Sequence, residues 1–374
     1  MDVNLNHRSG LLVVGRKMSK VLIINTSGLG MGGITTHMLN YLRRLKEMQY
    51  EAFFSIVVTG VRDKNVLEQF ENLGCELVYL PDRKKKLWKY CFALRRLLRN
   101  NDFDVLHVHG NSSTMGIELS LGKQFGIPVR IAHCHNSKCE HPYLHKLLLP
   151  IFKKSYTQAV ACSSLAGDWI FGKGKYIVLA NAIDLDKFQF NAEIRKEYRK
   201  ALKVADDTLL LGHVGNFNEQ KNHDFLIDIF DEVQKKKKAE LILIGTGPLL
   251  ADAKKKVNNF GMQDKVHFLG IRDDVGCWMQ AMDCFVFPSK WEGFGMVLIE
   301  GQTSNLPMVV STEVPIITKV TDNIRYISLS DGTGKWANLI INLASSADRI
   351  KPVDSRIKEY DINNNIEKLT KLYR

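Results

Sequence analysis

The chain alternates between short apolar runs and segments with helical periodicity. Six short, largely apolar runs lie at residues 21–25, 53–58, 76–80, 105–108, 129–133 and 159–162. Segments with apolar residues three or four apart, such as 36–48, lie between most of them. Because the runs do not alternate with polar residues, they predict strands buried on both faces. Such strands are typical of a parallel sheet covered by helices.

The same alternation restarts after about residue 205. Its apolar runs lie at residues 209–214, 239–244, 266–269, 284–288 and 308–311. The two series predict two Rossmann-like α/β domains with doubly wound parallel sheets. Because ligands of such sheets bind beyond the carboxyl ends of the strands, we expect the two domains to face one another across an active-site cleft.

The predicted division of the chain follows from these patterns. It comprises an N-terminal tail (1–17), a first Rossmann-like domain (18–180), a connector (181–204), a second Rossmann-like domain (205–345) and a helical C-terminal tail (346–374). Met1 and Met18 are both candidate starts of the protein.

Composition excludes several classes of protein. The 374 residues are 45% hydrophobic and 25% charged, as in globular proteins. No apolar run approaches the roughly 18 residues of a membrane-spanning helix. Seven cysteines without a C-x-x-C pair argue against a disulfide framework or a zinc ribbon. We therefore expect a cytoplasmic protein, free or peripheral at the inner face of the cell membrane.

The positive charge is concentrated in the first half. Residues 1–184 carry 25 Lys and Arg against 14 Asp and Glu, or +11, whereas residues 185–374 carry 27 against 26, or +1. This asymmetry predicts an anionic partner for the first half. No nucleic-acid-binding module accompanies the charge, so nucleic acid is not the expected partner.

A basic amphipathic segment, residues 82–100, contributes much of that charge. Its apolar face comprises Trp88, Cys91, Phe92, Leu94, Leu97 and Leu98, and its cations are Arg83, Lys84, Lys85, Lys86, Lys89, Arg95, Arg96 and Arg99. Such a helix can lie on an anionic membrane surface. It can equally pack its apolar face on the sheet with a solvated basic rim, and the two interpretations are compatible.

Glycines at 28, 30, 32 and 33 separate the first strand from the first helix. Backbone amides in such a loop can bind phosphate or carboxylate. A dinucleotide site would also require an acidic residue at the end of the second strand, which instead reads Val57-Val58-Thr59-Gly60. A nicotinamide site and a purely structural role for the glycines remain as alternatives.

The segment WEGFGMVLIE at 291–300 is more specific. Glu292 is expected in a loop and Glu300 about two turns into a helix, roughly 12 Å away along its axis. This spacing suits the two ends of an elongated ligand, with the helix amides facing a diphosphate between them.

From about residue 20 to about 345 the chain resembles the GT-B-fold retaining glycosyltransferases of family 4, especially the bacterial exopolysaccharide and capsule enzymes. The resemblance implies that Glu292 lies beside the donor sugar and that Glu300 binds the nucleotide ribose. It also implies that the amides of Phe294, Gly295, Met296 and Val297 form the phosphate-binding turn.

Further family motifs follow in HVGNFNEQKNHDFLIDIF at 213–230 and beyond. The resemblance assigns Lys221 to the donor diphosphate, and Asn216 replaces an arginine that the family has there. Remaining positions implied near the donor are Gly32, Gly33, Gly245, Gly247, Arg272 (with Ile271 beside the base) and His135, with His133 as the alternative to His135.

The implied activity is transfer of a hexose from a nucleoside diphosphate sugar, expected to be a UDP-sugar. The implied acceptor is a growing saccharide, expected to be linked to polyprenyl diphosphate. The resemblance thus makes 18–180 the acceptor-side domain and 205–345 the nucleotide-sugar-binding domain. Neither a metal nor a cofactor is expected. Three alternatives stay open: a nucleotide-sugar epimerase on the same scaffold, a catalytically impaired nucleotide-sugar-binding subunit, and a nicotinamide oxidoreductase.

Two sequence features resemble metal sites. Asp184-Leu-Asp186 has the D-x-D spacing of another glycosyltransferase fold, but it lies in a segment that resembles the family 4 interdomain connector. The second is a dense set of candidate ligands, His133, Cys134, His135, Cys139, His141 and His145. Its spacing fits no common zinc pattern, so no metal is predicted at either place.

Overall fold

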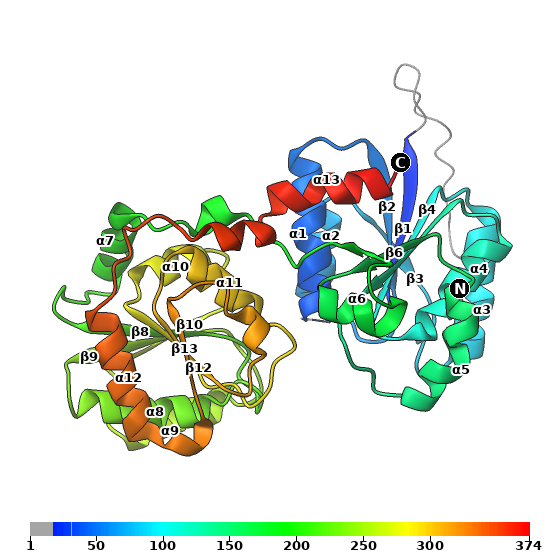
Figure 1. Ribbon diagram of the computed structural model, residues 1–374. Coiled ribbons are helices and arrows are strands. Elements are labelled where there is room, and N and C mark those ends of the chain that lie inside the picture. The colour runs from blue at the N-terminus through cyan, green and yellow to red at the C-terminus, as the bar shows by residue number, and fades with distance from the viewer. Residues whose placement is uncertain (1–17, 31) are drawn as a thin grey trace. The chain divides into compact units, whose positions relative to one another are not determined.

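The computed structural model describes residues 18–30 and 32–374 and divides into two compact units (Figure 1). The first unit contains the described residues up to Ala180 together with Asn365–Arg374, and the second is Asn181–Asn364. The predicted N-terminal tail, residues 1–17, lies outside the described residues.

The first unit is a seven-stranded parallel sheet with helices on both faces. Its strand order is β3-β2-β1-β4-β5-β6-β7. Its strands and α-helices are β1 (Ser19–Asn25), α1 (Gly33–Glu47), β2 (Ala52–Val58), α2 (Lys64–Asn72), β3 (Glu76–Tyr79), α3 (Leu87–Asn100), β4 (Val105–Gly110), α4 (Gly116–Gln124), β5 (Val129–Cys134), α5 (Pro142–Lys153), β6 (Gln158–Ala161), α6 (Ser164–Phe171), β7 (Ile177–Val178) and the final α13 (Ile362–Leu372).

Apolar side chains alternate between the two faces of this sheet, which explains the unbroken apolar runs. Leu22 and Ile24 of β1 join a core cluster with residues of α3, α4, α5 and α6. Ile23, between them, points to the other face, where it lines a small hollow with residues of α1 and α13. The last helix of the chain thus completes one layer of the first unit.

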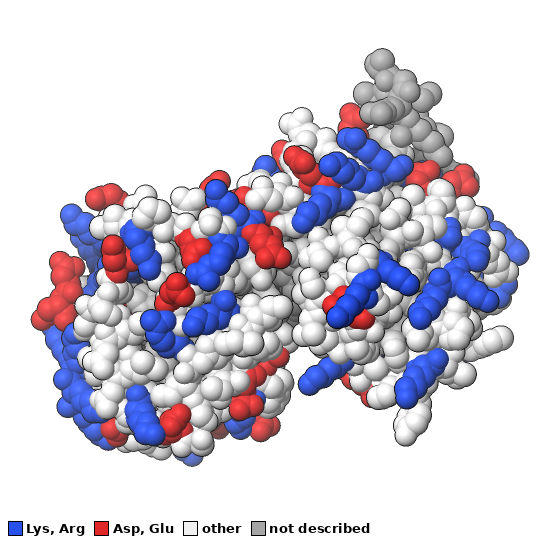
Figure 2. All heavy atoms as spheres, viewed as in Figure 1, with Lys and Arg blue, Asp and Glu red and all other residues white. Residues whose placement is uncertain are grey.

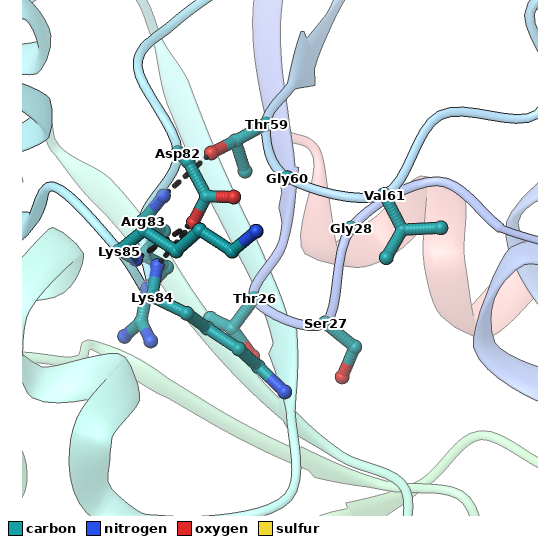
Figure 3. Close-up of a pocket in the computed structure, with 10 residues that line it drawn as sticks. All are labelled: Thr26, Ser27, Gly28, Thr59, Gly60, Val61, Asp82, Arg83, Lys84 and Lys85. Atoms are coloured by element: carbon teal, nitrogen blue, oxygen red, sulfur yellow. Dashed lines mark hydrogen bonds between the residues drawn. The ribbon is translucent and has the colours of Figure 1, made fainter.

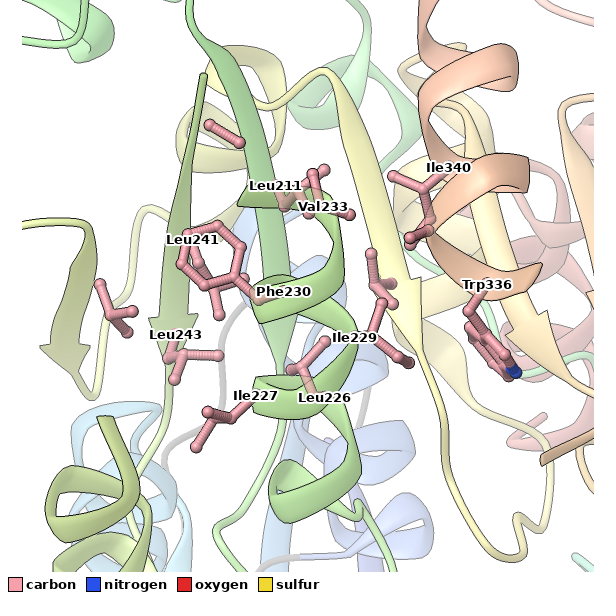
Figure 4. Packing of buried hydrophobic residues seen from close by; sticks show 14 of the residues in the cluster. Leu211, Leu226, Ile227, Ile229, Phe230, Val233, Leu241, Leu243, Trp336 and Ile340 are labelled. Atoms are coloured by element: carbon pink, nitrogen blue, oxygen red, sulfur yellow. The ribbon is translucent and has the colours of Figure 1, made fainter. Parts of the chain in front are cut away.

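The second unit is a six-stranded parallel sheet of the order β10-β9-β8-β11-β12-β13. Its strands and α-helices are α7 (Ala192–Ala201), β8 (Leu209–Val214), α8 (His223–Gln234), β9 (Ala239–Ile244), α9 (Leu250–Asn259), β10 (Val266–Gly270), α10 (Val275–Ala281), β11 (Cys284–Phe287), α11 (Met296–Thr303), β12 (Met308–Ser311), β13 (Ile324–Ile327) and α12 (Thr333–Ser345). Figure 4 shows α8 packed on β8 and β9, beside Trp336 and Ile340 of α12.

The predicted fold class, two doubly wound parallel-sheet α/β units, is confirmed. Each predicted strand is present, with ends shifted by at most a few residues. Two strands were not predicted: β7 has two residues, and β13 includes an arginine, Arg325. Within the described part of the chain no helix is long and apolar enough to cross a bilayer.

The basic segment at 82–100 requires two corrections. Arg83 does not belong to an exposed basic surface, because its Nε donates to Oε1 of the fully buried Glu118 at 2.6 Å. Trp88 and Phe92 do not pack with the rest of the predicted apolar face, being 86% and 70% exposed. Leu94 and Leu98 are buried as predicted, together with Tyr90, which the prediction did not include.

The Arg83–Glu118 pair gives a test of the first unit. Arg83→Met would leave the carboxylate of Glu118 buried without its cation, so we expect the free energy of unfolding to fall by about 3–5 kcal/mol. Urea denaturation followed by circular dichroism measures the change. The neighbouring Lys84→Met, at an exposed position, should shift stability by less than about 0.5 kcal/mol. Equal effects of the two substitutions would contradict a buried pair.

Candidate functional site

Strand order places a ligand-binding edge in the second unit. The chain runs from β8 outward to β9 and β10 and then returns to the other side of β8 as β11. The chain therefore leaves β8 and β11 at the same edge of the sheet and turns in opposite directions. Open α/β sheets bind ligands at such a point. Hydrogen bonds join the two loops: Lys290 N donates to Gln220 O at 2.8 Å, and Asn222 Nδ2 to Pro288 O at 3.2 Å.

Lys221 and Glu292 meet at this edge. Nζ of Lys221 forms an ion pair with Oε1 of Glu292, and both side chains are largely buried, at 15% and 7% exposure. Ser289 Oγ donates to the same carboxylate oxygen at 3.2 Å. The ammonium also lies 4.4 Å from the centroid of the Phe287 ring. The site thus holds a cation and a carboxylate, from loops 71 residues apart, in one hydrogen-bonded group.

Gly245 and Gly247 bring the loop after β9 against the loop after β8. A Cβ on Gly245 would lie 2.1 Å from Gly215 O, and one on Gly247 would lie 2.5 Å from Phe217 O. Both glycines also have positive φ, 137° and 155°. Their identity is therefore explained by backbone packing alone, which keeps these loops beside the exposed Asn216.

The start of α11 lies in the loop that carries Glu292. Gly295 takes the left-handed conformation (φ 75°) and begins the helix without a side-chain cap. Met296 and Val297 are its first two residues, and the Phe294 ring lies 5.6 Å from that of Tyr360. The first amides of a helix have no carbonyl partner within it and form the positive end of its dipole.

Glu300 lies about one turn into α11 rather than the expected two, because the helix begins at Met296, and its side chain is partly buried. Burial raises the pKa of its carboxyl from 4.5 to about 7. Arg272, by contrast, is held by Asp274: its Nε and Nη2 donate to the two carboxylate oxygens, each at 2.8 Å. This pairing fixes Arg272 beside the exposed Ile271.

In the first unit the loop after β1 borders a cavity of about 330 Å³. Its lining residues are Thr26, Ser27, Gly28, Thr59, Gly60, Val61, Asp82, Arg83, Lys84 and Lys85. Figure 3 shows Lys84 and Lys85 extending from the loop after β3 toward the loops after β1 and β2. Gly32 and Gly33 begin α1, with open space where a Cβ would lie.

His135, the predicted donor contact, belongs to a histidine cluster. His109 Nδ1 and His135 Nε2 lie 2.9 Å apart, and His107 Nε2 lies 3.1 Å from His133 Nδ1. Sequence reasoning considered His133 and His135 and missed their partners. The missed signal is a repeated H-x-H pattern, His107-x-His109 and His133-x-His135, at the ends of two strands that the fold pairs directly.

Of the residues in the two metal-like sequence features, His133 and His135 lie together in the histidine cluster, whereas several others have separate partners. Lys187 Nζ lies 3.2 Å from Asp184 Oδ2, and Gln189 Nε2 donates to Asp186 Oδ1 at 2.9 Å. Cys134 is buried in the core cluster on the other face of its sheet, and His145 Nδ1 accepts from Ser113 N.

Family comparisons identify both units. A model described as Glycosyltransferase Family 4 matches residues 31–187, and one described as Glycosyl transferases group 1 matches residues 208–346. The chain belongs to the family 4 and group 1 glycosyltransferases. Its two parallel-sheet units give the glycosyltransferase the GT-B architecture.

Similar proteins cover two thirds or more of the glycosyltransferase. The putative glycosyltransferase EpsF of Bacillus subtilis is 29% identical, covering 93% of this chain and 94% of its own. The UDP-Gal:alpha-D-GlcNAc-diphosphoundecaprenol alpha-1,3-galactosyltransferase of Escherichia coli is 27% identical and covers 68% of each chain. The crystal structure of Anabaena Alr3699/HepE in complex with UDP and glucose has a TM-score of 0.71 at 16% identity, covering 94% of this chain and 98% of its own.

The raised pKa of Glu300 predicts a pH-dependent stability of the glycosyltransferase. Because the folded-state pKa lies above the unfolded value, the native state binds more protons between pH 4.5 and about 7, so this carboxyl destabilises the fold progressively as pH rises through that window. Glu300→Gln should therefore stabilise the protein by about 1–3 kcal/mol at pH 8 and by much less at pH 4.5. The measurement is urea denaturation of both proteins at several pH values. A difference independent of pH would contradict the burial of this group.

Proposed function

We propose that this glycosyltransferase moves a hexose, with retention of anomeric configuration, from a nucleoside diphosphate sugar to a lipid-linked or growing saccharide in exopolysaccharide or capsule synthesis. The observation that carries the proposal is the largely buried Lys221–Glu292 pair at the edge of a doubly wound sheet. A UDP-sugar is the proposed donor, as in the name of the Escherichia coli relative.

Charge is the reason that the site suits a diphosphate leaving group. Negative charge develops on the diphosphate as the glycosidic bond breaks. A lysine held in a poorly solvated site stabilises that charge more strongly than it would in water. Amides of Phe294 to Val297 at the start of α11 supply a second, uncharged set of donors. In the absence of substrate, Glu292 compensates the lysine.

We propose front-face attack, without a covalent glycosyl-enzyme. The acceptor hydroxyl oxygen bonds to the anomeric carbon on the face that the diphosphate leaves, the bond from that carbon to the diphosphate oxygen breaks, and the hydroxyl proton passes to a leaving phosphate oxygen. Glu292 and Glu300 would accept hydrogen bonds from sugar and ribose hydroxyls respectively. Gly245, Gly247, Asn216 and Arg272 would border the nucleotide, and Gly32, Gly33 and His135 stay predicted donor contacts.

The acceptor end of the first unit combines lysines with exposed apolar side chains. The cavity that contains Lys84 and Lys85 adjoins a second cavity of about 510 Å³, which shares Thr26, Ser27, Arg83 and Lys84 and extends to Leu87 of α3 and Leu144 of α5. Beyond it, α3 exposes Trp88 and Phe92, and α5 exposes Tyr143, Leu147 and Ile151 at helical spacing. Such a surface suits a polyprenyl diphosphate, with phosphates at the lysines and the chain along the apolar helices.

The same surface supports a peripheral position on the cytoplasmic face of the membrane. Basic side chains gather over the part of the first unit where α3, α4 and α5 lie (Figure 2). The basic segment at 82–100 contributes these exposed cations: Lys84, Lys85, Lys86, Lys89, Arg95, Arg96 and Arg99. An anionic bilayer attracts such cations by about 1 kcal/mol each.

Asn216 supports one alternative, a catalytically impaired nucleotide-sugar-binding subunit, because it stands where the family resemblance expects an arginine. Asn216→Arg distinguishes the two: a gain in turnover would support impairment, and high wild-type turnover that the substitution lowers would exclude it. Incubation with donor alone tests the epimerase alternative, since only an epimerase converts the sugar without an acceptor.

Lys221→Met tests the donor site. Loss of the cation should lower kcat by 100-fold or more, judging from the loss of comparable electrostatic groups. A thermal-shift series with UDP, UDP-glucose and UDP-galactose should show stabilisation of the wild type and a smaller shift of the variant. Lys290→Met is the matched control, because Lys290 lies in the same loop region but pairs with the exposed Glu219. No response of folded wild type to any nucleotide sugar would refute the donor site.

Apolar substitutions test the membrane surface. Trp88→Ser, Phe92→Ser and Leu147→Ser together should weaken binding to vesicles containing phosphatidylglycerol by about 100-fold or more, because each removes exposed apolar area from the bilayer contact. Co-sedimentation measures binding. Ile316→Ser and Ile350→Ser, equally exposed in the second unit, should leave it unchanged. Equal vesicle binding by the wild type, the triple variant and the control variant would contradict the proposed surface.

A further inference from the structure

Five histidines gather inside the first unit, at the carboxyl ends of two adjacent strands. His107 and His109 lie on β4, His133 lies on β5 and His135 follows it, and the parallel register pairs His109 directly with His133. His37 of α1 packs over them, with its ring centroid 4.8 Å from that of His133 and 5.0 Å from that of His135. Residues at alternate positions share a face, so the two H-x-H pairs form one imidazole layer.

Nitrogen atoms of four of these rings lie close to one another. One ligand atom each from His37, His109, His133 and His135 lies within 4.8 Å of all the others. Zinc–nitrogen bonds of about 2.0–2.1 Å place tetrahedral ligand atoms about 3.4 Å apart. Each distance between two ligand nitrogens would therefore need to shorten by at most about 1.4 Å when an ion binds.

Most rings of the cluster are buried, which favours the neutral form of an imidazole. Burial is the main cause that lowers the pKa of His109, His133 and His135 well below 6.5, and neighbouring histidines lower it further. A neutral imidazole keeps a lone pair on one ring nitrogen, which is the form that binds metal ions. Packing several such rings together places their lone pairs and N–H groups close to one another in a small volume.

One ring nitrogen in this layer lacks a hydrogen-bond partner among the described residues. His133 is fully buried and its Nε2 is unpaired, while its Nδ1 is engaged by His107. His107 in turn has Nδ1 2.8 Å from the hydroxyl of Tyr373. A buried polar atom without a partner lowers the stability of the fold, and a ligand bound at this nitrogen would remove that penalty.

The chain of contacts behind His133 favours a lone pair on that nitrogen. If His133 Nδ1–H donates to His107 Nε2, then His107 Nδ1–H can donate to the Tyr373 hydroxyl oxygen, and His133 Nε2 is left as an acceptor. Metal-binding histidines are oriented in the same way by a hydrogen bond to their second ring nitrogen. His107 and Tyr373 would thus act as positioning residues rather than as ligands.

We propose that His37, His109, His133 and His135 bind a divalent transition-metal ion of the zinc type. Imidazole nitrogen suits Zn²⁺, Cu²⁺ and Ni²⁺, whereas Mg²⁺ and Ca²⁺ prefer oxygen ligands. His135, half-buried where the other three are almost fully buried, lies on the side from which an ion would enter. The four histidines belong to the first unit and Lys221 and Glu292 to the second, and this proposal does not rest on the proposed transferase activity.

Cobalt titration tests the site on the full chain, with any affinity tag removed and metal stripped by a chelator. We expect one Co²⁺ per chain, with visible absorption bands of a four-coordinate nitrogen site, and displacement of Co²⁺ by Zn²⁺. His133→Asn should abolish these bands. His107→Phe should weaken binding by about 10–100-fold, as loss of a group that orients a ligand does.

Cys139→Ser with His141→Gln is the matched control, because these residues lie close in sequence to His135 but outside the four-histidine group. It should bind Co²⁺ as the wild type does. Zn²⁺ should also raise the melting temperature of the wild type and not that of His133→Asn, whose circular dichroism spectrum verifies folding. Absence of stoichiometric Co²⁺ binding to the wild type, or unchanged binding by a folded His133→Asn, would overturn the proposal.

Discussion

Parallel pairing is the constraint on which the functional features of this protein depend. Every strand described in the two sheets runs in the same direction as its neighbours, so the carboxyl ends of all strands in a sheet meet at one edge. Lys221 and Glu292, 71 residues apart, become neighbours because β8 and β11 are adjacent. In the first sheet, adjacency of β4 and β5 assembles the histidine layer in the same way.

The Lys221–Glu292 pair shows how such an edge can be stable without its ligand. A largely buried ammonium would be costly alone, and Glu292 and the Phe287 ring each reduce that cost, while Ser289 donates to the carboxylate of Glu292. An incoming diphosphate would compete with Glu292 for the lysine, and the released carboxylate would then be available to sugar hydroxyls. Under the proposed function, the side chains that compensate one another's charge in the free protein would also bind the substrate.

Much of the fold could be predicted from the sequence, because buried parallel strands leave unbroken apolar runs. The pairing of Lys221 with Glu292 agrees with the grouping that motif resemblance suggested, although the roles of these residues remain untested. What the sequence did not reveal depends on contacts distant along the chain. Arg83 resembled its exposed basic neighbours until the fold placed Glu118 beside it, and the histidine layer needs three elements, α1, β4 and β5, to bring its rings together.

The return of the C-terminal segment to the first unit has a consequence for recombination between relatives. Residues Asn365–Arg374 belong to the first unit, where Leu369 and Tyr373 pack beside α1, although the whole second unit precedes them in the chain. A chimera spliced at one point near residue 180 would join the early strands of one parent to the closing helix of the other. Exchanging the complete first unit between two relatives therefore requires two splice junctions. The last ten residues must be taken from the same parent as the N-terminal portion.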